Sequence, residues 1–151
     1  MTDEQILASL RAEQVTDALI AVRNLLGIWR FVAPNEADLQ RQVFDVLGKD
    51  GRIVADREVR GGHGAFDILV RYTFDACAPV TIVLELKVRG GAAAVERQAQ
   101  RYAKVDGIDA VAVVTTSQRL ASALLRPGDV GQAPNSTLGG KPFRVLTLRS
   151  F

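Results

Sequence analysis

The chain has 151 residues, a formal net charge of +2 and a single cysteine, Cys77. This length is typical of one domain with its own core, so one domain is expected over residues 1–151. One cysteine excludes a disulfide framework and a multi-cysteine zinc site, and it fits a reducing, cytoplasmic setting. No run of about eighteen apolar residues predicts a membrane span. The small net charge permits a nucleic-acid partner without arguing for one.

Residues 3–29 have the apolar periodicity of a helix. The sizeable apolar side chains at three- and four-residue steps are Ile6, Leu7, Leu10, Val15, Leu19, Val22, Leu26 and Trp29. Pro34 disfavours helical geometry at the residue before it, so 1–33 forms an N-terminal helical extension. The helix can serve as a packing brace, which we favour, or as a dimer contact. A two-fold homodimer is expected to use whatever part of the stripe the core leaves uncovered.

A second helix is predicted to begin after Asn35, a good N-cap residue, and to end at Gly48. Its apolar stripe consists of Leu39, Val43, Val46 and Leu47. Glu36 lies three residues before the first of these, so its side chain is expected on the buried side of the helix or at its rim. Glu36 either favours the helix dipole or serves a site at the end of the sheet.

Three strands are predicted next, over residues 52–60, 64–70 and 80–88. The second carries Asp67, and the third, V-T-I-V-L-E-L-K-V, carries Glu85 and Lys87. Because strand side chains alternate between faces, Glu85 and Lys87 share one face. The second and third strands can pair as a hairpin, which would bring the carboxylates of Asp67 and Glu85 to one end of the sheet.

These charges are unusual because they lie inside apolar strands, where a charge is expensive unless it is paired or binds an ion. One interpretation is a neutralising pair between Glu85 and Lys87 near a strand end. The other is a cation site, since two close carboxylates repel each other unless a cation binds between them. Magnesium prefers carboxylate, water and phosphate oxygens as ligands. Lys87 would then hold or deprotonate a water, or offset the charge of a phosphate.

A helix is predicted over residues 92–105, after the break at Gly90-Gly91. Gln98 and Tyr102 are four residues apart, so their side chains stack on one side of this helix. A glutamine on a buried helix face needs hydrogen-bond partners. The pair is either a functional feature or two amphipathic residues that happen to share a face.

Positive charge gathers between residues 85 and 105. The basic residues there are Lys87, Arg89, Arg97, Arg101 and Lys104, against the acids Glu85 and Glu96. Such an excess suits a phosphate backbone, although a solvated helix face has a similar composition. Beyond it the sequence predicts a fourth strand over 109–116, a short helix over 117–125, a loop over 127–142 and a last strand over 143–148. A helix between two strands of one sheet indicates a crossover connection.

Phe66-Asp67, followed in the next strand by Glu85-Leu86-Lys87, resembles the motif of the PD-(D/E)XK nuclease superfamily, with Phe66 in place of the proline. The stretch Gln98-Ala99-Gln100-Arg101-Tyr102 is similar to the Q-x-x-x-Y motif of its RecB-type and lambda-exonuclease-type branch. The resemblance covers 35–116. It implies an α/β, restriction-endonuclease-like fold with an αβββαβ core, in which helices flank a mixed central sheet. The helix of 1–33 and the helix, loop and strand of 117–151 are additions to that core.

The resemblance further implies a metal-dependent nuclease that hydrolyses phosphodiester bonds in DNA, with Mg²⁺ as cofactor and Mn²⁺ as substitute. Asp67, Glu85 and the carbonyl of Leu86 would hold the metal, with Glu36 reaching it directly or through water. Lys87 would orient or activate the attacking water. Gln98 and Tyr102 would position the strand or the metal ligands, and Arg101 would neutralise a phosphate. Two alternatives stay open: a catalytically silent DNA-binding or interaction module of the same fold, and an unrelated α/β domain with structural ion pairs.

Overall fold

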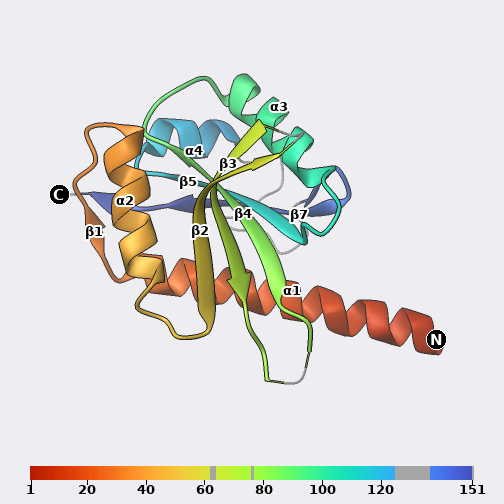
Figure 1. The fold of residues 1–151 in the computed structure, drawn as a ribbon. Coiled ribbons are helices and arrows are strands. Elements are labelled where there is room, and N and C mark those ends of the chain that lie inside the picture. Colours follow the sequence, from red (N-terminus) through yellow and green to blue (C-terminus); the bar gives the residue numbers. More distant parts are fainter. Residues whose placement is uncertain (62–63, 76, 125–136, 151) are drawn as a thin grey trace.

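The protein is built on a mixed sheet of six strands with helices on both faces, as the computed structural model describes it for residues 1–61, 64–75, 77–124 and 137–150 (Figure 1). The strand order is β2-β3-β4-β5-β7-β6. The strands are β2 (Ile53–Gly61), β3 (Gly64–Tyr72), β4 (Val80–Lys87), β5 (Ala110–Thr115), β7 (Lys141–Thr147) and β6 (Thr137–Leu138). The predicted α/β class and the mixed sheet are thereby confirmed.

The pairing directions follow from the connections between the strands. Strands β2, β3 and β4 pair antiparallel, whereas β4, β5 and β7 run parallel to one another. The predicted hairpin of the second and third strands is therefore confirmed, and so is the crossover that connects β4 to β5 through a helix. Short β6 pairs antiparallel with β7 at the far edge.

Two details of the sheet differ from the prediction. The residues 137–142, predicted as loop, contain β6 and the start of β7, and the two-residue strands β1 (Arg30–Phe31) and β8 (Arg149–Ser150) pair in parallel. Strands this short carry no periodicity that a sequence pattern could reveal. Residues 62–63, which lie between the first two strands, and residues 127–136 of the predicted loop lie outside the described residues.

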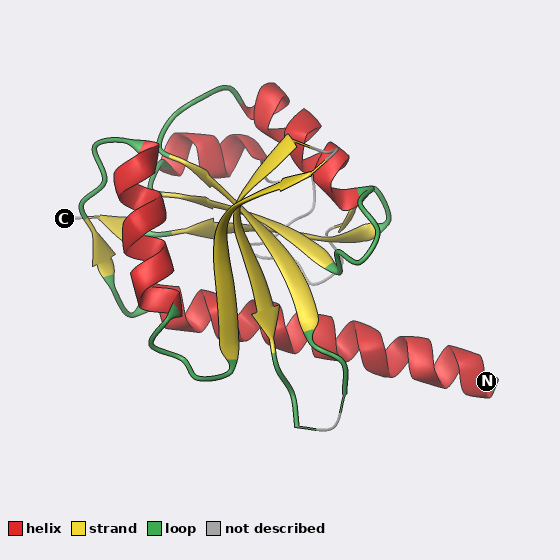
Figure 2. Ribbon diagram, viewed as in Figure 1, coloured by secondary structure: helices red, strands yellow, loops and turns green. Residues whose placement is uncertain are grey.

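Four helices in the described residues cover the sheet in two layers (Figure 2). Helices α1 (Asp3–Gly27) and α2 (Glu36–Leu47) pack on one face, and α3 (Ala92–Ala103) and α4 (Gln118–Leu124) pack on the other. Strand β4 serves both cores, because Ile82, Leu84 and Leu86 face α1 and α2 while Val83 faces α3 and α4. Burial on both faces explains why β5 is almost wholly apolar and why β4 is rich in valine, isoleucine and leucine apart from its polar residues.

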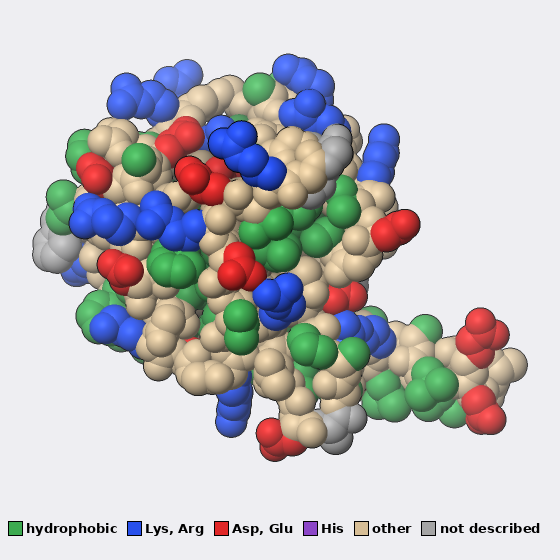
Figure 3. Space-filling view, viewed as in Figure 1, with side chains coloured by type: hydrophobic (Ala, Val, Ile, Leu, Met, Phe, Trp, Pro, Cys, Tyr) green, Lys and Arg blue, Asp and Glu red, His purple; other side chains and the backbone are tan. Residues whose placement is uncertain are grey.

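Helix α1 begins outside the body of the protein and ends inside it. Thr2 and Gln5 form a capping box at its start. Its buried residues are Val15, Ala18, Leu19, Val22 and Leu26, whereas Ile6, Leu7 and Leu10 are 41%, 66% and 49% exposed. The first turns project past the sheet in Figure 1, and Figure 3 shows hydrophobic side chains on this projecting part, with acidic ones at its tip. The C-terminal half of the helix is therefore the brace. No helix among the described residues is long and apolar enough to cross a membrane.

The β2–β3 hairpin bends as it approaches the candidate site. Glu58 has a φ of +52°, in the left-handed region that non-glycine residues rarely occupy. Glu58 and Asp67 lie across from each other, between the pairs Arg57–Ile68 and Val59–Phe66. Past this point the hairpin changes sides, because Ile68 belongs to the core under α1 and α2 while Phe66 packs against α3. The bend separates the tip of β3 from β4.

Candidate active site

Asp67 lies where β3 leaves β4. The last paired residues of the two strands are Ile68 and Leu84, and continuing the register by one step would pair Asp67 with Glu85. Beyond this step the two strands no longer pair through their backbones. Instead, the backbone amide of Leu86 donates a 2.8 Å hydrogen bond to the side-chain oxygen Oδ2 of Asp67. The hairpin thus brings the two predicted carboxylates together at one end of the sheet.

Leu86, predicted to offer its carbonyl to a metal, is placed by the same contact. The N–H and C=O of a strand residue point toward the same neighbouring strand. Because the Leu86 amide points at Asp67, its carbonyl also faces the region that β3 vacates. Its apolar side chain is 1% exposed and packs on the opposite face from Glu85, under α1 and α2.

Glu85 is the most deeply buried charged residue of the site, at 1% exposure. Burial and the neighbouring charge of Asp67 raise its pKa to about 8, against an opposing effect of Lys87. Burial also raises the pKa of Asp67, while the Leu86 amide and Lys87 act in the other direction. A hydrogen bond between the side chains of Glu85 and Asp67 also contributes to these shifts. No hydrogen-bond donor among the described residues reaches Glu85 Oε2. Burying an oxygen without a donor costs free energy, so the folded protein bears a cost at Glu85.

Lys87 lies between two of the predicted acids. Its Nζ is 3.4 Å from Glu85 Oε1 and 3.8 Å from Glu36 Oε2. The neutralising Glu85–Lys87 pair therefore exists, but it leaves the second oxygen of Glu85 unsatisfied. Glu36 stands at the start of α2, where Asn35 caps the helix by accepting a 2.9 Å bond from the Asp38 amide. With a side chain 48% exposed, Glu36 lies at the rim rather than on the buried face.

Gln98 and Tyr102 interact as their spacing on α3 predicts. Gln98 Nε2 donates a 2.6 Å hydrogen bond to the Tyr102 hydroxyl, which donates at 2.8 Å to the carbonyl of Ala65. The Tyr102 ring meets Phe66 edge-on with 4.8 Å between the centroids. Burial and the charge of Glu85 raise the Tyr102 pKa to about 12, so the hydroxyl stays a donor.

These contacts decide what each member of the Q-x-x-x-Y stretch can do. Tyr102 is 1% exposed, and its hydroxyl ties α3 to β3 two residues before Asp67. Gln98 is half-buried and supports Tyr102. Arg101 is exposed on α3.

A cavity of about 250 Å³ opens beside Asp67, and it contains residues that the sequence analysis missed. It is lined by Glu36, Ala37, Gln40, Arg57, Glu58 and Asp67. Gln40 is 8% exposed, and its Nε2 donates a 3.2 Å hydrogen bond to the carbonyl of Asp67. The sequence did indicate that Gln40 faces the site, because Gln40 stands at helical spacing between Glu36 and the apolar stripe of α2. Arg57 and Glu58 carried no such signal.

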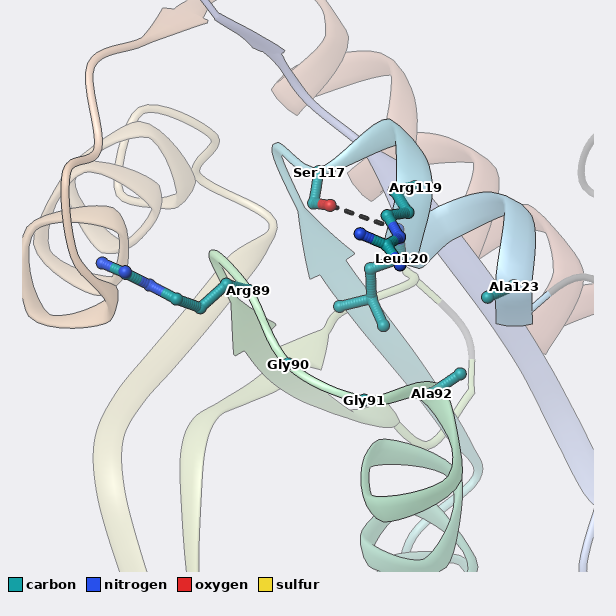
Figure 4. A pocket seen from close by; sticks show the side chains of 8 residues that line it. All are labelled: Arg89, Gly90, Gly91, Ala92, Ser117, Arg119, Leu120 and Ala123. Carbon is teal, nitrogen blue, oxygen red and sulfur yellow. Dashed lines mark hydrogen bonds between the residues drawn. The ribbon is translucent and has the colours of Figure 1, made fainter.

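A second hollow of about 460 Å³ lies beyond the ends of β4 and β5, between the first turns of α3 and α4 (Figure 4). Its described lining includes Arg89 and Arg119 but no acid. The Arg89 side chain turns away from this hollow, and one of its nitrogens lies 3.4 Å from the Pro34 carbonyl. Ser117 Oγ accepts a 3.1 Å bond from the Leu120 amide and is thereby used as a cap. Of these two hollows, as their described residues line them, the one beside Asp67 contains the acids.

Comparison of the chain with family models, curated proteins and solved structures found no match. Among the described residues, no group of three or more His, Cys, Asp or Glu side chains is placed to hold a metal ion. The site consists instead of the buried Glu85 beside the half-buried Asp67, a lysine between two acids, and a cavity that opens to solvent beside them.

Proposed function

We propose that the protein is a metal-dependent nuclease of the PD-(D/E)XK type, with a restriction-endonuclease-like core over 35–116. The observation that carries the proposal is the buried Glu85, which has a raised pKa and an oxygen without a donor, next to Asp67 and Lys87. Strongly perturbed titratable groups that gather beside a cavity are typical of active sites. The order of elements, from α2 through β2, β3 and β4 to α3 and β5, matches the order that the resemblance implies.

The donor set fits a hard divalent cation. Mg²⁺ binds through one or two carboxylates, keeps several waters and takes further ligands from substrate phosphates, so a cluster of three acids is not required. Asp67, Glu85 and the Leu86 carbonyl supply oxygen ligands on one side of the site. The unpartnered Oε2 of Glu85 supports this fit, because a cation would compensate the cost of burying it. Mn²⁺ prefers the same ligands and would substitute.

Each residue of the site then has a separate role in the proposed reaction. When bound, Mg²⁺ acidifies water and stabilises negative charge on a phosphate. Asp67 and Glu85 hold the cation and fix its place relative to the sheet. Lys87 donates from its ammonium group to the attacking water or to a phosphate oxygen, and Glu36 holds Lys87 from the rim.

The substrate of this chemistry is a phosphodiester, and DNA is the proposed polymer. The proposed role of Arg101, which is exposed on α3, is to neutralise a phosphate, while Gln98 and Tyr102 keep β3 in position. A homodimer is proposed as well, because the projecting turns of α1 expose Ile6, Leu7 and Leu10. Light scattering tests this part separately: a mass of 16.3 kDa would refute the dimer.

Cleavage of DNA in the presence of Mg²⁺ or Mn²⁺ tests the proposal. Plasmid, linear duplex, single-stranded and branched DNA are offered in parallel, with chelator as the negative control. Cutting that requires the metal and is lost in Lys87→Ala supports the nuclease. Cutting by that variant at the parental rate would show that the activity belongs elsewhere.

A further inference from the structure

We propose that Arg57 binds a backbone phosphate of the nucleic-acid strand beside the cleavage site and that Gln40 positions it. This inference rests on the proposed nuclease function and adds a substrate contact to it. Arg57 lies on β2 and lines the cavity that also contains Asp67 and Glu36. Consecutive strand residues ordinarily point to opposite faces, but the left-handed backbone at Glu58 lets both Arg57 and Glu58 line the cavity.

Gln40 holds the guanidinium in one orientation. The Oε1 of Gln40 accepts from Arg57 Nε at 3.2 Å and from Nη2 at 2.9 Å, while its Nε2 donates to the Asp67 carbonyl. The guanidinium carbon also lies 5.6 Å from the centre of the Phe44 ring. One nearly buried amide thus fixes Arg57 relative to the backbone of Asp67. Ordering a long side chain in this way costs conformational entropy, and an arginine that only faces solvent does not need to be ordered.

The orientation leaves one edge of the guanidinium for a ligand. Nε and one N–H of Nη2 serve Gln40, so Nη1 and the remaining N–H of Nη2 form a fork that matches two oxygens of a phosphate. No carboxylate among the described residues lies within ion-pair distance of Arg57, and Gln40 is a neutral acceptor. The charge of Arg57 is therefore not neutralised by a fixed partner.

The charges of the cavity explain why a substrate needs this cation. Glu36, Glu58 and Asp67 line it and would repel a phosphodiester. Lys87 is already shared between Glu36 and Glu85. Arg57 is the cavity-lining cation that has no acid of its own among the described residues, so it can offset the repulsion where the strand enters.

The test is equilibrium binding of a fluorescent DNA duplex to the full chain in chelator, over a series of salt concentrations, with cleavage in Mg²⁺ measured in parallel. Arg57→Ala is expected to weaken binding by roughly tenfold and to reduce the slope of log affinity against log salt by about one. Arg57→Lys should keep the slope but lose affinity, because lysine cannot make the fork. Arg23→Ala, which removes an exposed arginine on α1, is the matched control and should match the parent.

Arg57→Gln removes the charge but keeps part of the aliphatic side chain, so it replaces Arg57→Ala if that variant unfolds. An unchanged affinity and salt slope in the folded variant overturns the inference, whether or not the parent cuts DNA. A parent that never cuts, but whose binding depends on Arg57, overturns the nuclease and leaves the phosphate contact standing. A parent that binds no DNA overturns both.

Discussion

Replacing Glu85 by glutamine should make the metal-free protein more stable, and increasingly so as the pH rises. In the native state Glu85 keeps its proton up to a pKa of about 8, whereas in the unfolded chain it loses the proton near 4.5. Between these values the native state binds more protons, so the free energy of unfolding falls as the pH rises. The pKa difference corresponds to at most about 5 kcal/mol. Glutamine keeps the shape of the side chain and has no proton to lose.

The expected gain is smaller than this ceiling, because Lys87 loses its nearer partner and keeps only Glu36 at 3.8 Å. We expect the free energy of unfolding of Glu85→Gln, relative to that of the parent, to rise by about 2–3 kcal/mol from pH 5 to pH 9. This change lies in the range found when other buried ion pairs are replaced. Urea unfolding at both pH values in chelator measures the difference. Glu13→Gln, on the exposed face of α1, is the matched control and should show no such trend. If Glu85→Gln and the parent have the same free energy of unfolding at both pH values, the environment assigned to Glu85 is refuted.

Mg²⁺ should raise the unfolding temperature of the parent near neutral pH, and its binding should release a proton, because the carboxylate pair must ionise to bind the cation. Thermal scans with and without chelator should show that Asp67→Asn loses most of this rise. Tyr102→Phe should cost about 0.5–1.5 kcal/mol in urea unfolding, since it removes the part-buried hydrogen bond to the Ala65 carbonyl, whereas Tyr72→Phe loses only a 3.4 Å contact and should cost less. Glu58→Gly should leave the stability unchanged or raise it by up to ~1 kcal/mol, because glycine tolerates the φ of +52° at this position. Arg60→Gly on the same strand is the control and should destabilise the protein. Equal losses of stability in the two variants would contradict the strain at Glu58.

The sequence predicted the elements whose causes are local. The apolar run of β4 follows from burial on both faces, and Asn35 caps α2 through a bond to a residue three positions away. The meeting of Asp67 and Glu85 was also predictable, because a hairpin brings residues on both sides of its loop into register. The Gln98–Tyr102 contact needs only the spacing of one helix.

What the sequence could not predict depends on distant parts of the chain. The left-handed backbone of Glu58 reflects the bend of the hairpin over α3, and no residue type at that position announces it. The link from Gln40 to Arg57 joins α2 to β2 through side chains whose meeting only the packed helix determines. The apolar stripe of α1 was predicted as one surface, but whether each part is covered depends on where the sheet ends.

Asp67, Glu85 and Lys87 are proposed to form one metal-dependent nuclease site. The most direct measurement is DNA cleavage in Mg²⁺ by the parent, Asp67→Asn, Glu85→Gln and Lys87→Ala, all purified identically and checked for folding. Glu13→Gln serves as the control that should cut like the parent. The expected result is that each of the three site variants loses cutting while staying folded. Parental rates in all three, or a parent that cuts equally well in chelator, would contradict it.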